Sequence, residues 1–274
     1  MITLELKNIS LSYDHHLVVK GMSFRVVPGE MVGLIGPNGC GKTSIIKALS
    51  RIIYPSSGEI LLDGKEISRI PRGELARLIG VVPQNPSLPA TFTVFEVVLL
   101  GRNPHLGLLR SESARDLAIA GWAMERTATG ELAERRMGEL SGGERQRVTI
   151  ARVLAQEPKA ILLDEPTANL DISHQVGILD LIKKLCLEKK LAVLVALHDL
   201  NLATQYCDRL LLIKDGQIHA EGTPSEVITP KNIKEVYGAE SCVYPHPANH
   251  LPIVLPRGDF SKLAQSDNRV KTGE

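Results

Sequence analysis

The sequence predicts an α/β fold, in which helices cover a sheet of mainly parallel strands. The apolar run at 31–35 leads directly into a glycine-rich turn, and the apolar residues after that turn have helical spacing. This order indicates a buried strand that feeds a helix. A second apolar run, at 160–163, ends at Asp164 and Glu165. Acidic residues at the carboxyl end of a buried strand lie where α/β sheets hold their ligands.

Hydrophobic periodicity and turn residues predict the remaining elements. The first eighty residues are rich in strand patterns, and a helical region interrupts the sheet at 87–157. The expected strands are 2–12, 22–27, 59–63, 80–83, 191–197, 210–213 and 217–221, and the expected helices are 92–100, 112–127 and 144–156. We expect a core at 1–86 and 158–222, a C-terminal extension at 223–256 and a flexible tail at 257–274.

The composition is that of an ordinary globular protein. Of the 274 residues, 43% are apolar and 23% are charged, and with a net charge of +1 nothing in the overall balance argues for a protein that wraps nucleic acid. The apolar stretch at 191–197 is far shorter than the roughly 20 residues that span a membrane. The cysteines have no paired spacing, so we expect reduced thiols at Cys40, Cys186, Cys207 and Cys242. Any membrane role must come through a partner.

The turn at 36–43 fits the phosphate-loop pattern, Gly-x4-Gly-Lys-Thr, between a strand and a helix. Its glycines let backbone N–H groups face phosphate oxygens, and the helix N-terminus adds partial positive charge. Lys42 is expected to neutralise the β- and γ-phosphates, and the Thr43 hydroxyl to bind Mg²⁺. The predicted nucleotide-binding residues here are Gly36, Pro37, Asn38, Gly39, Cys40, Gly41, Lys42, Thr43 and Ser44.

The two acids after 160–163 supply the chemistry that a phosphate loop needs. Asp164 is placed to hold Mg²⁺ through water, and Glu165 to polarise an attacking water as a general base. Two acids in a solvated turn are the alternative interpretation. A phosphate loop in the same chain favours the catalytic one.

A second helix begins at glycines in the segment 141–144, Ser-Gly-Gly-Glu. Ser141 and Glu144 form a capping box, and Gly142 and Gly143 leave N–H groups open to a phosphate. An ordinary well-capped helix with an arginine-rich exposed side is the alternative. Because this anion site lacks the lysine and the metal ligand of the first, it suggests a nucleotide pocket shared between two copies of the chain.

Residues 140–147, Leu-Ser-Gly-Gly-Glu-Arg-Gln-Arg, resemble the signature motif of ATP-binding-cassette (ABC) ATPases. Other motifs of that family occur in their usual order, and the resemblance covers about residues 1–222. It implies a P-loop NTPase with a RecA-like parallel-sheet core, an N-terminal antiparallel β subdomain and a helical insertion. It also implies the cofactors ATP and Mg²⁺, and a head-to-tail dimer in which Ser141, Gly142 and Gly143 of one copy close the site of the other.

The resemblance implies roles for residues outside the phosphate loop. Tyr13 is similar to the aromatic residue that stacks on adenine, and Gln84 to the Q-loop glutamine that senses Mg²⁺ and the membrane partner. Asp171 lies in a segment that resembles the D-loop, and His198 resembles the switch histidine that contacts the γ-phosphate. The implied catalytic set is Glu165, His198, Lys42 and Gln84, and the implied metal ligands are Thr43, Gln84 and Asp164.

Two stretches resemble one branch of the family, the ATPases of iron-siderophore, haem and cobalamin importers: 100–105, Leu-Gly-Arg-Asn-Pro-His, and 221–256. The implied function is ATP hydrolysis that powers import of an iron chelate or cobalamin through a separate permease. A substrate-binding protein is then an indirect partner, nucleic acid is not a partner, and the subunit is peripheral at the cytoplasmic face of the cell membrane. Both stretches could equally be a turn and a packed hairpin with no bearing on cargo.

Other functions stay open at the level of sequence. The cargo could differ, for example a metal oxyanion, or the chain could be a soluble ABC ATPase of translation or DNA repair. A cassette that binds ATP only as a dimerisation switch is a third possibility, although an intact Glu165 argues against it. His246 and His250 lack the further ligands that a metal site needs.

Cys40 has a special position in the phosphate loop. It lies two residues before Lys42 at a helix N-terminus, an environment that lowers the pKa of a thiol. We therefore expect a reactive thiol whose alkylation blocks ATP hydrolysis and which bound ATP protects. A tolerated small side chain is the alternative.

Overall fold

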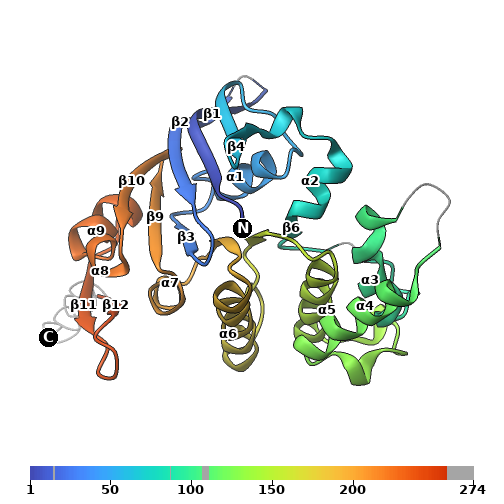
Figure 1. Ribbon diagram of the computed structural model, residues 1–274. Coiled ribbons are helices and arrows are strands. Elements are labelled where there is room, and N and C mark those ends of the chain that lie inside the picture. The colour runs from blue at the N-terminus through green and yellow to red at the C-terminus, as the bar shows by residue number, and fades with distance from the viewer. Residues whose placement is uncertain (15, 87, 107–110, 258–274) are drawn as a thin grey trace, which may run out of the picture.

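The computed structural model describes residues 1–257 except residue 15, residue 87 and residues 107–110. The chain forms a six-stranded sheet, a four-stranded sheet and a group of helices to one side of both (Figure 1). The α/β fold predicted from the sequence is confirmed. The tail expected at 257–274 lies outside the described residues apart from Arg257.

The larger sheet has the strand order β10-β9-β3-β8-β7-β6, and each pair is parallel except β10 with β9. The strands are β10 (Gln217–Gly222), β9 (Arg209–Lys214), β3 (Met31–Ile35), β8 (Ala192–Ala196), β7 (Ala160–Asp164) and β6 (Ile79–Val82). Every residue of β3, β7 and β8 is buried. Both faces of these strands are therefore covered, which explains why their sequences are continuous apolar runs.

The smaller sheet is antiparallel, with the order β2-β1-β4-β5. Its strands are β2 (His16–Val26), β1 (Leu4–Tyr13), β4 (Ser57–Leu62) and β5 (Lys65–Glu66), so β2 begins well before the predicted position 22. Apolar residues of β1 share one core with α1 (Lys42–Leu49). The sequence did not predict α2 (Arg72–Leu78) or the 3-10 helix Ile67–Arg69. Leu75 is the one buried residue of α2, which leaves almost no apolar periodicity to detect.

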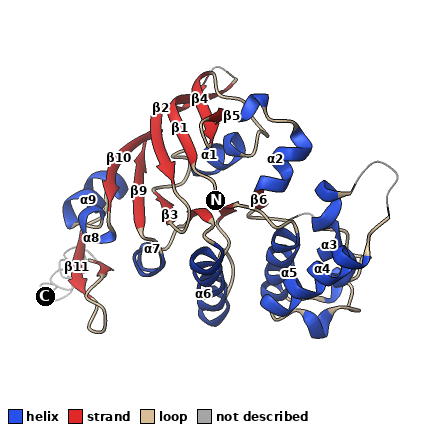
Figure 2. Ribbon diagram, viewed as in Figure 1, coloured by secondary structure: helices blue, strands red, loops and turns tan. Residues whose placement is uncertain are grey.

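The predicted helices between β6 and β7 are present, as α3 (Val94–Leu99), α4 (Ala114–Arg126) and α5 (Gly142–Ala155). Short 3-10 helices lie at Leu100–His105, Gly130–Leu132 and Met137–Glu139. Figure 2 shows the three α-helices packed together beside the sheets. No described helix of the protein is both long and apolar enough to cross a membrane.

The Gly-Arg stretch within 100–105 has a packing role. Arg102 is 3% exposed and donates to Asp116 Oδ1 at 2.9 Å, to the Ala155 carbonyl at 2.7 Å and to Glu157 Oε2 at 2.9 Å. A side chain on Gly101 would come within 2.1 Å of a carbonyl oxygen of α5. These contacts tie α4 to the end of α5.

The C-terminal half adds helices and a hairpin. Helix α6 (Ile172–Lys189) follows β7, and α7 (Leu200–Tyr206) follows β8. The extension contains α8 (Pro224–Val227), α9 (Pro230–Tyr237) and the antiparallel hairpin of β11 (Ser241–Pro245) and β12 (Pro252–Pro256). The hairpin packs on α7 through β12 and on α9 through β11. Its turn holds His246 and His250, and the described residues place no third metal ligand beside them.

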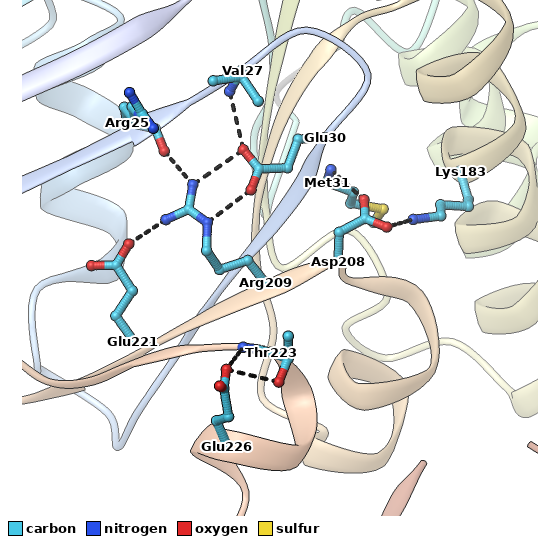
Figure 3. Close-up of polar contacts among 10 residues, drawn as sticks. All are labelled: Arg25, Val27, Glu30, Met31, Lys183, Asp208, Arg209, Glu221, Thr223 and Glu226. Carbon is cyan, nitrogen blue, oxygen red and sulfur yellow. Dashed lines mark hydrogen bonds and ion pairs between the residues drawn. The ribbon is translucent and has the colours of Figure 1, made fainter. Parts of the chain in front are cut away.

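An ion-pair cluster connects the two sheets near the start of β9 (Figure 3). Arg209 donates to both carboxylate oxygens of Glu30, at 2.8 and 3.1 Å, to Glu221, and to the Arg25 carbonyl of β2 at 2.5 Å. The side chains of Arg209 and Glu30 are only 20% and 16% exposed. A bidentate ion pair that is largely shielded from solvent fixes the orientation of both side chains.

Replacing Arg209 with alanine should lower the free energy of unfolding by about 3 kcal/mol, because Glu30 would stay partly buried without its cation. Denaturant titration followed by circular dichroism measures the change. Arg69→Ala is the control: Arg69 pairs with Glu66 at 3.0 Å, but its side chain is 84% exposed. Its loss should cost less than about 0.5 kcal/mol. Equal losses in both variants would contradict the role given to the cluster.

Candidate active site

The phosphate loop joins β3 to α1 through glycines with positive φ. Gly36, Gly39 and Gly41 have φ angles of 149°, 79° and 110°, which disfavour any residue with a side chain. Space is also short at Gly36, where a Cβ atom would lie 2.3 Å from the Ile213 carbonyl oxygen. Gly41 is the N-cap of α1 and provides no side-chain cap. The first N–H groups of α1 are therefore open to an anion.

Lys42 lies inside the loop rather than in solvent. Its ammonium donates to the carbonyl oxygens of Gly36 at 2.8 Å and Pro37 at 3.2 Å, and the residue is 5% exposed. These acceptors are neutral, so they orient the positive charge of Lys42 without cancelling it. A phosphate group is the natural complement of a charge held in this way.

Thr43 and Asp164 present oxygen atoms to a common point. Thr43 Oγ1 donates to Asp164 Oδ1 at 3.1 Å, from α1 to the end of β7. Burial raises the pKa of Asp164; the Thr43 hydrogen bond opposes this shift and the charge of Glu165 adds to it. A cation beside these oxygens would offset the unfavourable burial. The pair suits Mg²⁺, which proteins hold with one or two carboxylates and substrate phosphates.

Glu165 lies between two polar partners. It has a φ of 50° and is 9% exposed. One carboxylate oxygen accepts a hydrogen bond from the Gln84 amide, and the other contacts Nε2 of His198. Gln84 follows β6 and His198 follows β8, the strands on either side of β7. The structure thus brings together three of the residues that the sequence predicts to be catalytic.

A cavity of about 330 Å³ opens over the phosphate loop, within the size range of small-molecule sites. Its lining consists of Tyr13, Val18, Asn38, Gly39, Gly41, Lys42, Thr43, Ser44 and Glu165. Tyr13 is 38% exposed at the end of β1, where its ring can stack on a base. Val18 was not predicted, because a valine within a strand carries no signal of a ligand.

Ser141, Gly142 and Gly143 are not among the residues that line this cavity. Ser141 is the N-cap of α5 and forms the predicted capping box: Ser141 Oγ accepts from the Glu144 N–H at 3.3 Å, and Glu144 Oε2 accepts from the Ser141 N–H at 2.8 Å. Figure 2 shows α5 beside α3 and α4 rather than beside α1. Ser141 and Gly142 are both exposed, so the second glycine site faces outward.

Asp171 is the N-cap of α6 and contacts His174, which in turn packs against Gly143 at the start of α5. Asp171 Oδ1 accepts from the His174 N–H at 2.9 Å and lies 2.7 Å from His174 Nδ1. The imidazole packs against Gly143, where a Cβ atom would come within 2.5 Å of His174 Cδ2. His174 could not be predicted as part of this site, since its contact with Gly143 joins two different helices.

The expectation that Cys40 has a lowered pKa is wrong. The residue is 4% exposed and belongs to the core beneath the loop. Burial raises the pKa of the Cys40 thiol, although the positive charge of Lys42 acts in the opposite direction. Desolvation therefore outweighs the neighbouring cation. The alternative interpretation, a small side chain that fits the loop, agrees with this environment.

Comparison with known proteins places this geometry in a family. A family model described as ABC transporter matches residues 19–168. The chain belongs to the ABC transporter family. The hemin import ATP-binding protein HmuV of Gloeobacter violaceus is 43% identical to this ABC ATPase over 253 residues, 90% of this chain and 91% of that protein. The ferric enterobactin transport ATP-binding protein FepC of Escherichia coli K12 is 39% identical over 252 residues, 92% and 93% of the two chains.

Solved structures of ABC transporters share the fold. A transporter described as of the metal-chelate type, in an inward-facing conformation, has a TM-score of 0.82 at 26% identity and covers 96% of this chain and 99% of its own. The dimeric structure of MJ0796, a bacterial ABC transporter cassette, has a TM-score of 0.71 at 30% identity, with coverage of 80% and 98%. The prediction of a P-loop NTPase fold is therefore confirmed, and the ABC ATPase binds nucleotide.

Asp164→Asn should stabilise the nucleotide-free ABC ATPase by about 1 kcal/mol at neutral pH, because asparagine removes a buried charge and can still accept from Thr43. The raised pKa of Asp164 means that burial disfavours its ionised form. The gain should therefore be present above that pKa and disappear as falling pH protonates the native carboxyl group. Thermal denaturation as a function of pH measures it. A variant less stable than the wild type at neutral pH would contradict this account of the site.

Proposed function

We propose that the chain is the ATP-hydrolysing subunit of an importer for an iron chelate, and that its catalytic base is Glu165. The observation that carries the proposal is the position of this carboxylate. It is held by Gln84 and His198 at the edge of a cavity that also contains Lys42 and Thr43. A base, a fixed cation and a phosphate cradle at one site are the parts that phosphoryl transfer to water requires.

Each residue has a distinct task in the proposed reaction. Tyr13 stacks on the adenine, the N–H groups of the loop hold the phosphates, and Lys42 balances their charge. Glu165, oriented by Gln84 and His198, accepts the proton of a water that attacks the γ-phosphorus in line with the leaving oxygen. Because Gln84 contacts Glu165 through its amide nitrogen, this contact leaves its amide oxygen available to bind a metal ion.

Mg²⁺ belongs beside the oxygens of Thr43, Asp164 and Gln84. When bound there, it would neutralise negative charge on the β- and γ-phosphates. The raised pKa of Asp164 supports this assignment, because a buried carboxylate next to Glu165 gains from a nearby cation.

A second copy of the chain would complete the site. Ser141 and Gly142 are exposed, and neither they nor Gly143 line the cavity of their own chain. In a head-to-tail pair, the N-terminus of α5 of one copy would face the phosphates held by the other, with Asp171 at the boundary. The dimeric cassette among the similar structures supports this arrangement.

The cargo assignment rests on relatives and on the partner that an importer needs. The names of the relatives HmuV and FepC refer to haem and to ferric enterobactin, so the proposed cargo is haem or a ferric siderophore, with cobalamin as the alternative. A transmembrane permease would bind this subunit at the cytoplasmic face, and a binding protein would deliver the cargo. Each copy would have a core at 1–86 and 158–222. When the two cores close on ATP, the Gln84 loop and a helical subdomain at 87–157 would transmit the movement to the permease.

ATP hydrolysis by the complete transporter in liposomes tests the cargo. A binding protein loaded with ferric siderophore or haem should raise the rate about fivefold or more over the empty binding protein, because delivery of cargo and closure of the ATP site are coupled. Phosphate release measures it. A transporter with Glu165→Gln should bind ATP but release almost no phosphate with any cargo. Stimulation by cobalamin or by an oxyanion alone would contradict the proposed cargo.

A further inference from the structure

The helix that follows His198 is too short to be stable without contacts to the rest of the protein. Helix α7 has 7 residues, and isolated helices of fewer than about 12 residues are marginal in water. Asp199, directly after His198, is its N-cap, and the Asp199 carboxylate accepts from the N–H groups of Asn201 at 2.7 Å and Leu202 at 3.0 Å. The backbone of His198 thus continues directly into α7. Whatever fixes α7 in place also fixes the imidazole.

The C-terminal hairpin provides that support. Helix α7 packs more extensively on β12 than on any other described element. Asn201 Oδ1 accepts from the Val254 N–H at 2.8 Å, and Asn201 Nδ2 donates to the Val254 carbonyl at 3.3 Å. Thr204, 1% exposed, shares its Oγ1 hydrogen between the Asn201 carbonyl at 2.8 Å and the Pro252 carbonyl at 3.0 Å. One amide side chain therefore satisfies both backbone groups of Val254, as a neighbouring strand would.

Helix α9 of the same extension packs against the main core. Tyr237, the last residue of α9, packs against the main core, and its hydroxyl is buried without a hydrogen-bond partner among the described residues. Burial raises the pKa of Tyr237. Lys214 Nζ donates to the Glu235 carbonyl at 2.7 Å, which holds α9 to the end of β9. Helix α9 is thereby anchored to the larger sheet, whereas only the hairpin bonds to α7.

We propose that Asn201 is a positioning residue for ATP hydrolysis, and that the hairpin β11–β12 acts through it to hold His198 against Glu165. The imidazole contacts Glu165 from a position just before α7, so a shift of this helix moves the ring away from the carboxylate. A displacement of about 1 Å can cost a reaction about 100-fold in rate. The inference rests on the ATPase function proposed above, and it gives the hairpin β11–β12 a role in ATP hydrolysis.

A double-mutant cycle on the purified full chain tests the inference. Asn201→Leu removes both bonds to Val254 at similar side-chain size and should lower kcat about tenfold, with the KM for ATP unchanged. In a His198→Ala background, the same substitution should change kcat less than about twofold, because the group that Asn201 positions is absent. Single-turnover measurements with enzyme in excess keep the slow variants measurable.

A matched variant separates positioning from general stability. Asn232→Leu removes a similar bond, from Asn232 Nδ2 to the Val227 carbonyl at 2.8 Å, in the same extension but without a hydrogen bond to α7. It should also lower the melting temperature, while leaving kcat within about twofold of the wild type. Thr204→Val removes the bond to Pro252 and should also lower kcat. It tests the same role of the hairpin if Asn201→Leu does not fold.

The outcomes distinguish failure of the inference from failure of the function. An unchanged kcat in Asn201→Leu, or an equal loss in the wild-type and His198→Ala backgrounds, would overturn the positioning role and leave the ATPase intact. A loss of kcat in Asn232→Leu equal to that in Asn201→Leu would also overturn it. A wild-type chain that hydrolyses no ATP would overturn the proposed function itself and the inference with it.

Discussion

One buried carboxylate and the strands that hold it determine the arrangement of the site. Glu165 emerges from β7, which is buried along its length and flanked by β6 and β8. Parallel neighbours end at the same edge of a sheet, so the residues after these three strands meet there. Gln84 and His198 reach the two oxygens of Glu165 for this reason. Helix α1 begins at the same edge, which lets Thr43 bond to Asp164.

This concentration of polar groups is unfavourable for the chain without a ligand. Lys42, Asp164 and Glu165 are each less than a tenth exposed, and the raised pKa of Asp164 reflects that burial. The stability of the fold must therefore come from the two apolar cores and from partly buried ion pairs such as Arg209 with Glu30. A site whose charges are arranged for a ligand commonly has this character, because activity and maximal stability conflict.

The sequence was sufficient to predict a structural feature wherever that feature depends on residues close together in the chain. The phosphate loop, the acids after 160–163 and the capping box at Ser141 each depend on short spacing beside an apolar run or a helix start, and the structure forms all of them. Contacts between segments that are distant along the chain could not be predicted, because they follow no local sequence pattern. Arg209 and Glu30 are 179 residues apart, and the contact of His174 with Gly143 joins different helices.

Burial was the other quantity that the sequence could not supply. The neighbours of Cys40 suggested a lowered thiol pKa, but packing beneath the loop raises it. The resemblance of 100–105 to the importer branch agrees with the relatives, but only the structure shows that Arg102 is buried and ties α4 to α5. The burial of Cys40 and Arg102 depends on residues that are distant along the chain, so the sequence pattern alone could not predict it.

If a second copy completes the nucleotide site, ATP must drive dimerisation, and the mass of the Glu165→Gln variant tests this most directly. Light scattering should give the mass of two chains with MgATP, since blocked hydrolysis preserves the closed pair, and of one chain without nucleotide. Adding Ser141→Arg should return the mass to one chain while ATP still binds. A single-chain mass with ATP bound to Glu165→Gln, or a dimer unaffected by Ser141→Arg, would contradict the shared site.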